Sequence, residues 1–425
     1  MFSKKILINA ALVLCSILFS LFIAEVFLRS VKPYFLTARF LLPPNLDVKF
    51  KTLEFDTQVK TNSIGIRGER EYSIKHNGKF RIAVIGDSFT FGWGVNNDET
   101  FPAKLENHFR KSNHSNVEVI NFGRPGENLE GYLRAFNLHA KRLQPQIVIV
   151  ALTPTNDCTL SFPAGYIAGA SHIKRFATKV TERGLRPWEK VTSYLGRLIT
   201  TRVTKPLRLK LRAALIEPFE ATAAIRDPID GSDNPLTPNK LEKMLSSNPE
   251  ARARYHRLNK AGWVAKGLGW DVAPWLVLSA IFGPRVTKNV LLLDPKTRPA
   301  FEFQWKICAQ VIKNFQAIVE KAGSRFILVL LATPAQTSPE FLANRKALGI
   351  DIPRLALTDS HVNDGLMVFC KREGVQCIDT LEPARNAAQH NPQLFFPIDG
   401  HPARSAHSLF ASIIARELRS FLPDR

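Results

Sequence analysis

RIAVIGDSFTFGWG, residues 81–94, contains a short apolar run that ends in a glycine, an aspartate and a serine. Residues 82–85 are all apolar, which is typical of a strand buried on both faces of a parallel sheet. Gly86 and Asp87 interrupt the run, so Ser88 is expected at the carboxyl end of this strand, where open α/β sheets place their ligand sites. Most serines in such turns cap a helix or form the turn itself. A role for Ser88 therefore depends on which residues the fold brings to the same edge.

Strand-like and helix-like patterns alternate on both sides of a long interruption. We expect further strands at 117–122, 146–152, 325–332 and 375–379, and helices at 98–111, 127–143, 299–322, 358–373 and 403–421. Apolar strands separated by helices of this length form right-handed βαβ units in a parallel sheet. The sequence therefore predicts an α/β domain made of residues 80–158 and 291–425, preceded by a turn-rich approach segment at 30–79.

The interruption, residues 159–290, is strongly basic. It contains 22 Lys and Arg against 10 Asp and Glu, so it carries +12 of the net charge of +21 of the whole chain. Its pattern is mostly helical, and Trp263, Trp270 and Trp275 lie near its end. For residues 262–283 of this insertion we expect a buried hairpin within the fold, and a lid or membrane-interface segment is the alternative. The positive charge suits an anionic partner such as a membrane surface or an acidic polysaccharide.

Residues 1–29 are predicted to anchor the protein in a membrane. Lys4 and Lys5 precede a largely apolar run of 23 residues, 6–28, which at ~1.5 Å per residue is long enough to cross a hydrocarbon core of ~30 Å. The run is longer than the apolar part of a signal peptide and lacks a small-residue exit, so an uncleaved single-pass anchor is favoured over a cleaved signal. The two lysines favour an amino terminus inside the cell, although basic residues also follow the run and weaken this signal.

The five cysteines are Cys15, Cys158, Cys308, Cys370 and Cys377. None of them has the paired CxxC spacing of a structural zinc site, so thiolate metal binding is not expected. We interpret them as unpaired thiols, most of them buried. A bridge between Cys370 and Cys377 is the alternative, on condition that the turn between them brings them close.

Three more polar stretches fall at the ends of predicted strands or the starts of helices: NFGRPGEN at 121–128, TPTND at 153–157 and DGH at 399–401. Together with Gly86-Asp87-Ser88 they resemble, in the same order, the four sequence blocks of the SGNH, or GDSL-like, hydrolases. Each block alone is weak evidence for the family, but four blocks in the same order are specific. The resemblance covers residues 80–160 and 325–420. It implies a three-layer α/β/α sandwich with a flavodoxin-like parallel sheet. Together with the anchor predicted from the apolar run, it indicates a membrane-anchored bacterial member of the family.

The resemblance assigns a role to each matching residue. Ser88 is the nucleophile, and its backbone N–H, the backbone N–H of Gly126 and the side-chain amide of Asn156 form the oxyanion hole. His401 takes the proton from Ser88, and Asp399 orients the imidazole. The family usually has two residues between the aspartate and the histidine. Here Gly400 alone separates them, a variant that also occurs in the family.

Neighbouring polar residues invite other readings. His407 is the competing base, but it falls inside the closing helix, where packing or solvent exposure is expected. Asp87 lies beside Ser88, yet adjacent residues of an extended chain point to opposite faces, so we expect it to make structural hydrogen bonds. Asp157 is interpreted in the same way, as a carboxylate that braces its loop.

Several other classes lack their motifs in this sequence. There is no GxSxG elbow of an ordinary α/β-hydrolase, no HExxH zinc motif and no GxxxxGK phosphate loop. Nucleic-acid binding is supported only by net charge, without a recognisable module. The residues of the four blocks require neither a metal nor an organic cofactor.

The predicted function is that of a serine esterase that removes an O-acyl group, in the first place O-acetyl, from a cell-envelope carbohydrate through an acyl-serine intermediate. Its catalytic domain is expected outside the cytoplasmic membrane. Two alternatives stay open: a polysaccharide O-acyltransferase with the same triad, and a non-catalytic member that binds polysaccharide in an export complex.

Overall fold

The computed structural model describes residues 9, 12–13, 15–23, 26, 41–74, 78–158, 245–246, 248–269, 271–282, 298–391 and 393–423. The chain divides into two compact units, one of residues 1–39 and 185–217 and the other of residues 40–184 and 218–425. Apart from a short helical segment within residues 9–26, all described residues belong to the second unit. The second unit contains the candidate site.

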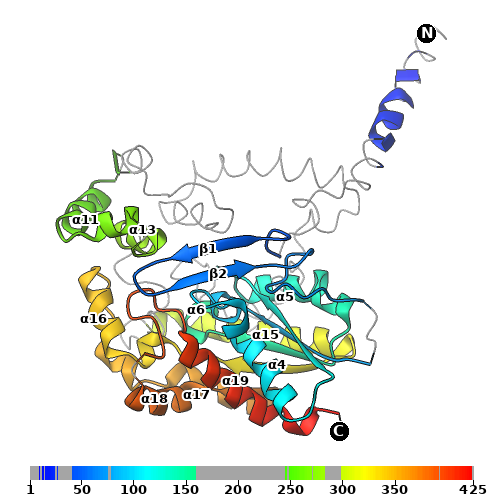
Figure 1. Cartoon of the computed structure of the whole chain (residues 1–425). Helices are drawn as coiled ribbons and strands as arrows, with labels where there is room; N and C mark the ends of the chain where they lie inside the picture. Colours follow the sequence, from blue (N-terminus) through cyan, green and yellow to red (C-terminus); the bar gives the residue numbers. More distant parts are fainter. Residues whose placement is uncertain are drawn as a thin grey trace. The chain divides into compact units, whose positions relative to one another are not determined.

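A parallel five-stranded sheet forms the centre of this unit (Figure 1). Its strands are β3 (Phe80–Gly86), β4 (Val117–Gly123), β5 (Ile147–Leu152), β6 (Arg325–Leu330) and β7 (Gln376–Asp379), arranged in the order β4-β3-β5-β6-β7. The chain passes from β3 to β4 on one side and then crosses to β5 on the other side of β3. The order therefore reverses at β3, and such a switch point is where open α/β sheets bind their ligands.

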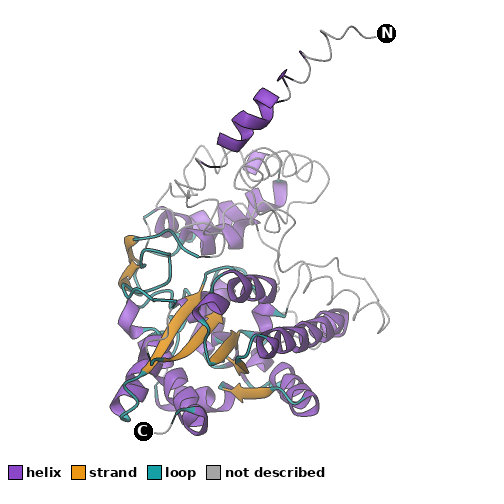
Figure 2. Cartoon of the chain, turned by 90° about the vertical axis from the view of Figure 1, so that its right-hand side faces the viewer, coloured by secondary structure: helices purple, strands orange, loops and turns teal. Residues whose placement is uncertain are grey.

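Helices cover both faces of the sheet (Figure 2). Ala83 and Ile85 of β3 point into an apolar core shared with α5 (Leu129–Leu138), α15 (Arg298–Lys321) and α17 (His361–Glu373). Ile82 and Val84 point to the opposite core, which is shared with α4 (Phe101–Lys111), α18 (Leu381–His390) and α19 (Arg404–Leu418). These four side chains are at most 1% exposed, which explains the unbroken apolar run. The expected α/β fold with a parallel sheet is confirmed.

Most predicted elements agree with the structure within about three residues. The helix predicted at 127–143 is instead α5 followed by a separate 3-10 turn, Ala140–Leu143. The approach segment contains an antiparallel hairpin that was not predicted, made of β1 (Asp47–Lys51) and β2 (Asp56–Lys60). Phe50, Phe55 and Val59 of this hairpin region pack against Phe91 and Trp93, so the hairpin lies directly beside the segment that follows Ser88.

The described part of the insertion is helical, as expected. It consists of α11 (Pro249–Lys260), α12 (Trp263–Leu268) and α13 (Pro274–Phe282), which share a small apolar core that also includes Leu348 and, partly buried, Ile398. Trp263 is packed into this core, whereas the predicted interfacial residue Trp270 and most of the insertion lie outside the described residues.

Of the predicted anchor run, residues 6–28, the structure describes 9, 12–13, 15–23 and 26, and the others lie outside the described residues. Within the part of the chain that is described, no helix is both long and apolar enough to cross a bilayer.

The expectation of unpaired thiols was wrong for two of the cysteines. Cys158 and Cys308, 150 residues apart in sequence, form a disulfide with a Cα–Cα distance of 5.0 Å. Cys158 follows β5 and Cys308 lies on α15, which covers the same face of the sheet, so only the folded topology brings them together. Cys370 and Cys377 are free thiols, as expected.

Candidate active site

Ser88 begins a one-turn helix, α3 (Ser88–Phe91), immediately after β3. Asp87 caps this helix, since its Oδ1 accepts the backbone N–H of Phe89 at 2.9 Å. A Cβ on Gly86 would lie 2.0 Å from Oγ1 of Thr90, so the chain turns from strand to helix in a space that only glycine fits. The turn places the Ser88 hydroxyl at the carboxyl edge of the sheet, as expected.

The loop before α19 brings two more predicted residues to Ser88. Nε2 of His401 lies 2.8 Å from Oγ of Ser88, and Nδ1 of His401 is hydrogen-bonded to Oδ1 of Asp399. Gly400 has a φ of +90°, which turns the backbone between the two side chains. Asp399 and His401 can therefore bond to each other although only one residue separates them. Ser88, His401 and Asp399 therefore form one continuous chain of hydrogen bonds.

The charges around Asp399 determine which atom donates and which accepts in each of these hydrogen bonds. Burial raises the pKa of the Asp399 carboxyl, but the charge of His401, hydrogen bonds from His401 and the charge of Arg345 together lower it below its ordinary value. An ionised Asp399 accepts the proton of Nδ1 and leaves Nε2 of His401 as an acceptor for the Ser88 hydroxyl. This order of bonds is the one that general-base activation of a serine requires.

Gly126 lies in the turn after β4. The backbone N–H of Arg124 donates to the carbonyl of Gly86 at 3.0 Å, which brings this turn to the end of β3. Gly126 itself has a left-handed backbone, with a φ of +76°. Within the described part of the chain, the N–H groups of Ser88 and Gly126 donate to no other protein group. Both are thus available to a bound oxygen atom.

Asn156 lies on α6 (Pro154–Asp157), directly after β5. Its amide nitrogen donates to Oδ2 of Asp87 at 3.2 Å and to Oδ1 of Asp157 at 3.3 Å. The structure therefore brings Asn156 to the residue beside Ser88, with its amide turned toward two carboxylates. The predicted oxyanion role of Asn156 stays a prediction.

The two carboxylates make the bracing contacts expected of them. Oδ2 of Asp157 accepts the N–H of Thr153 at 2.7 Å and the hydroxyl of Tyr132 at 2.9 Å. Asp87 is 1% exposed, and burial raises the pKa of its carboxyl despite hydrogen bonds and the charge of His401, which lower it. Together these contacts fix α6 against the start of α3.

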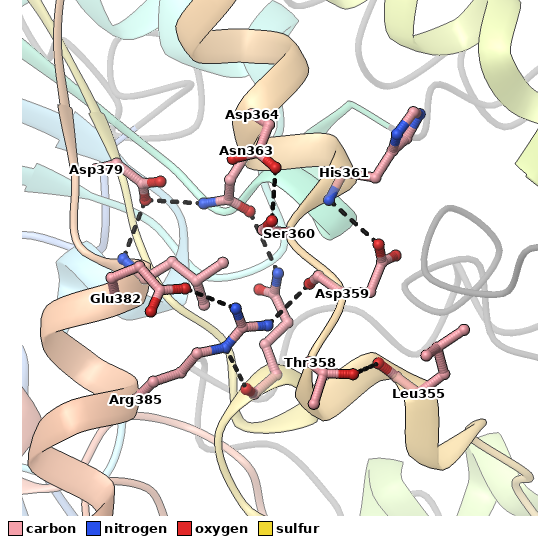
Figure 3. A network of polar contacts seen from close by, with 12 residues as sticks. Leu355, Thr358, Asp359, Ser360, His361, Asn363, Asp364, Asp379, Glu382 and Arg385 are labelled. Carbon is pink, nitrogen blue, oxygen red and sulfur yellow. Dashed lines mark hydrogen bonds and ion pairs between the residues drawn. The ribbon is translucent and has the colours of Figure 1, made fainter.

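A further polar network, which was not predicted from the sequence, lies beyond the ends of β6 and β7 (Figure 3). Asn363 of α17 donates to Asp379 at 2.8 Å and accepts from Gln336 at 3.2 Å. Arg385 reaches Glu382 and the backbone carbonyl of Asp359, as Figure 3 shows. These side chains satisfy one another's hydrogen-bonding groups and connect α17 to the sheet, so we assign them a structural role.

His407 is separate from this site. It is fully buried on α19, where its Nδ1 accepts the backbone N–H of Phe101 at 3.1 Å and its ring stacks on that of Phe101. Burial lowers the pKa of His407 to about 3. Of the two environments expected for His407, packing and solvent exposure, the structure shows packing.

Residues 84–231 match the model of the GDSL-like lipase/acylhydrolase family. The matched segment is about a third of the chain and contains Ser88, Gly126 and Asn156. These findings support a GDSL-like, ester-hydrolysing enzyme. Asp399 and His401 lie outside the matched segment.

Solved structures with a remote similarity include three hydrolases. One is a lipase/acylhydrolase from Enterococcus faecalis, 11% identical, with a TM-score of 0.36 over 81% of this chain and 98% of that chain. Another is an α/β hydrolase from a metagenome of Lake Arreo, 11% identical, with a TM-score of 0.35 over 82% and 99%. A GDSL-like lipase from Bacteroides thetaiotaomicron is 11% identical, with a TM-score of 0.31 over 80% and 89%. No curated protein matches the sequence.

The buried state of His407 predicts an acid-dependent loss of stability. Its folded pKa of about 3 lies below the ordinary value of 6.5, so the unfolded chain binds the proton first. The stabilising effect is complete above pH 6.5 and is lost as the pH falls toward 3. Between pH 8 and pH 5, this one group should lower the free energy of unfolding by about 2 kcal/mol.

Urea unfolding of the wild-type protein and of His407→Gln at both pH values measures this contribution. The wild type should lose about 2 kcal/mol more than the variant on going to pH 5. An identical pH dependence of the two proteins would show that His407 is not held neutral by the fold.

Proposed function

We propose that this protein is a serine esterase in which Ser88, His401 and Asp399 form the catalytic triad. The observation that carries the proposal is the hydrogen-bonded chain from Oγ of Ser88 through both nitrogens of His401 to Asp399. Oγ attacks the ester carbonyl carbon while Nε2 of His401 takes its proton. The tetrahedral intermediate then collapses, and His401 gives the proton to the leaving alcohol.

Water completes the reaction. It attacks the acyl-Ser88 carbonyl, and His401 removes its proton. When the second tetrahedral intermediate collapses, the acid leaves and His401 returns the proton to Oγ of Ser88, so the free enzyme is restored. Throughout, the ionised Asp399 stabilises the positive charge that develops on His401.

The oxyanion is held by the N–H groups of Ser88 and Gly126 and by the amide of Asn156. The two bonds of the Asn156 amide, at 3.2 and 3.3 Å, are long for N–H donors to a carboxylate, so a negatively charged oxygen competes for one of them. One such donor is worth about 2.7–4 kcal/mol in comparable sites.

The proposed substrate is an O-acetyl ester on an acidic cell-envelope carbohydrate. The basic insertion supports this class, because its described helices adjoin the loop that carries Asp399. The backbone N–H of Leu53 donates to the carbonyl of Asp271, and Ile398 packs against the α11–α13 core. The described helices α11 and α12 carry five basic side chains against the single acidic residue Glu250, and positive charge next to the site attracts an anionic polymer.

We place the catalytic unit outside the cytoplasmic membrane, tethered by residues 1–29. The apolar run at 6–28 and the disulfide between Cys158 and Cys308 support this placement, since disulfides persist mainly in oxidising compartments. The anchor keeps the enzyme close to envelope polymers and to lipid.

The catalytic assignment predicts that a fluorophosphonate labels Ser88 of the full-length protein in detergent. Ser88→Ala should abolish labelling, and His401→Ala should lower the labelling rate and the hydrolysis of p-nitrophenyl acetate by about 10³-fold or more, because the hydroxyl then lacks its base. Ser408→Ala is a matched control, since Ser408 is exposed and its hydroxyl donates to the backbone carbonyl of Arg404 on its own helix. Labelling of Ser88→Ala at the wild-type level would rule out Ser88 as the nucleophile, and a wild type that is neither labelled nor hydrolyses the ester would favour a binding protein.

The substrate assignment predicts a preference that depends on salt. Acetate release from an acidic acetylated oligosaccharide should have a higher kcat/KM than release from a neutral one, and the ratio should fall toward 1 as ionic strength rises. No preference at any ionic strength would rule out steering by the insertion. If an added sugar acceptor lowers acetate release and becomes acetylated, the enzyme is an O-acyltransferase.

A further inference from the structure

Glu54 lies in the turn between β1 and β2, far in sequence from the candidate triad. Its carboxylate accepts the backbone N–H of Ile398 at 2.6 Å and the backbone N–H of Asp399 at 2.7 Å, one on each oxygen. The hairpin thus binds the main chain at the triad aspartate itself. Charge-assisted bonds of this kind are among the stronger hydrogen bonds in proteins.

The carbonyl groups of the same loop are held from the other side by α16 (Pro339–Ala347). Arg345 donates to the carbonyl of Asp399 at 2.9 Å, and Asn344 donates to the carbonyl of Pro397 at 3.0 Å. The guanidinium of Arg345 lies over the ring of Phe341 at 4.5 Å. The main chain of Asp399 is therefore fixed at its N–H by Glu54 and at its carbonyl by Arg345.

The loop leaves little space for another arrangement. A Cβ on Gly400 would lie 2.5 Å from the ring of Phe341, and the rings of Phe55 and Phe396 contact each other with centroids 5.1 Å apart. Because one residue separates Asp399 from His401, any rotation of the loop moves both side chains relative to Ser88. The contacts at its main chain therefore decide whether His401 faces Ser88.

The charges around Asp399 also favour a functional role for Glu54. Burial raises the pKa of the Glu54 carboxyl, two backbone N–H groups lower it, and the nearby charge of Asp399 raises it. A second carboxylate next to Asp399 is unfavourable in a turn that serves stability alone. Arg345 interacts electrostatically with both carboxylates, so its positive charge offsets part of the repulsion between Glu54 and Asp399.

We propose that Glu54, with Arg345, is a positioning residue that holds the Asp399 loop so that His401 faces Ser88, which makes the β1–β2 hairpin part of the catalytic machinery. The proposal rests on the triad proposed above. Glu54 does not act as an acid or base itself, because both of its oxygens are occupied by backbone N–H groups.

The test compares Glu54→Gln and Glu54→Ala in the full-length protein. The glutamine keeps the size of the side chain but presents an NH₂ group to one of the two backbone N–H groups, and the alanine removes both acceptors. Misplacement of a catalytic group by about 1 Å can cost about 100-fold. We expect kcat for p-nitrophenyl acetate to fall about 10-fold in Glu54→Gln and about 100-fold in Glu54→Ala, with KM within about twofold.

Fluorophosphonate labelling of Ser88 should slow by the same factors, because it needs the same activation by His401. Asp56→Asn is the matched control, since Asp56 is on the same hairpin and, among the described residues, its carboxylate forms its ion pair with Lys49 at the surface. All proteins are assayed well below their unfolding temperatures, so a loss of stability alone leaves kcat and labelling unchanged. If Glu54→Ala does not fold, Glu54→Gln decides.

The outcomes separate this inference from the proposed function. Wild-type kcat and labelling in Glu54→Gln, or a raised KM with unchanged kcat, overturn the positioning role while an inactive Ser88→Ala preserves the triad. Activity in Ser88→Ala would overturn the assignment of the triad and, with it, the positioning role of Glu54.

Discussion

The hydrogen bond between Ser88 and His401 is the contact on which the functional interpretation depends. It joins residues 313 positions apart, so neither element can place it alone. Ser88 is set by the turn from β3 to α3, and His401 is set by a loop that is bonded on both sides by distant segments. The sheet sets the position of Ser88, and the β1–β2 hairpin and α16 set the position of the His401 loop. All three elements therefore determine the distance between Ser88 and His401.

The strand order explains why these segments meet where they do. β3 lies between β4 and β5, so the loops after all three strands gather around Ser88. Gly86 pairs with Gly123 on one side and with Ala151 on the other, which places the three strand ends at the same height. Gly126 and Asn156 therefore reach the edge at which the serine is exposed.

Local patterns were enough to predict the sheet and the residues at its edge. The apolar run at 82–85, the turn residues after each strand and the DGH segment are visible in sequence because each results from a short-range constraint. The disulfide between Cys158 and Cys308 and the bonds from Glu54 to the Asp399 loop were not predictable, since they join segments that only the tertiary fold brings together. The β1–β2 hairpin was missed for a related reason: its alternation is short and follows a proline-containing stretch that indicates a loop.

The central claim is that Ser88 carries an acyl group during turnover and that His401 is needed to put it there. Rapid quenching of the full-length protein with an activated acetyl ester, followed by proteolysis and mass spectrometry, tests this claim most directly. We expect one acetyl group, located on Ser88, which is absent in Ser88→Ala and strongly reduced in His401→Ala. Acetylation of another residue at the turnover rate, or turnover with no acetylated protein in the burst phase and no dependence on Ser88, would contradict it.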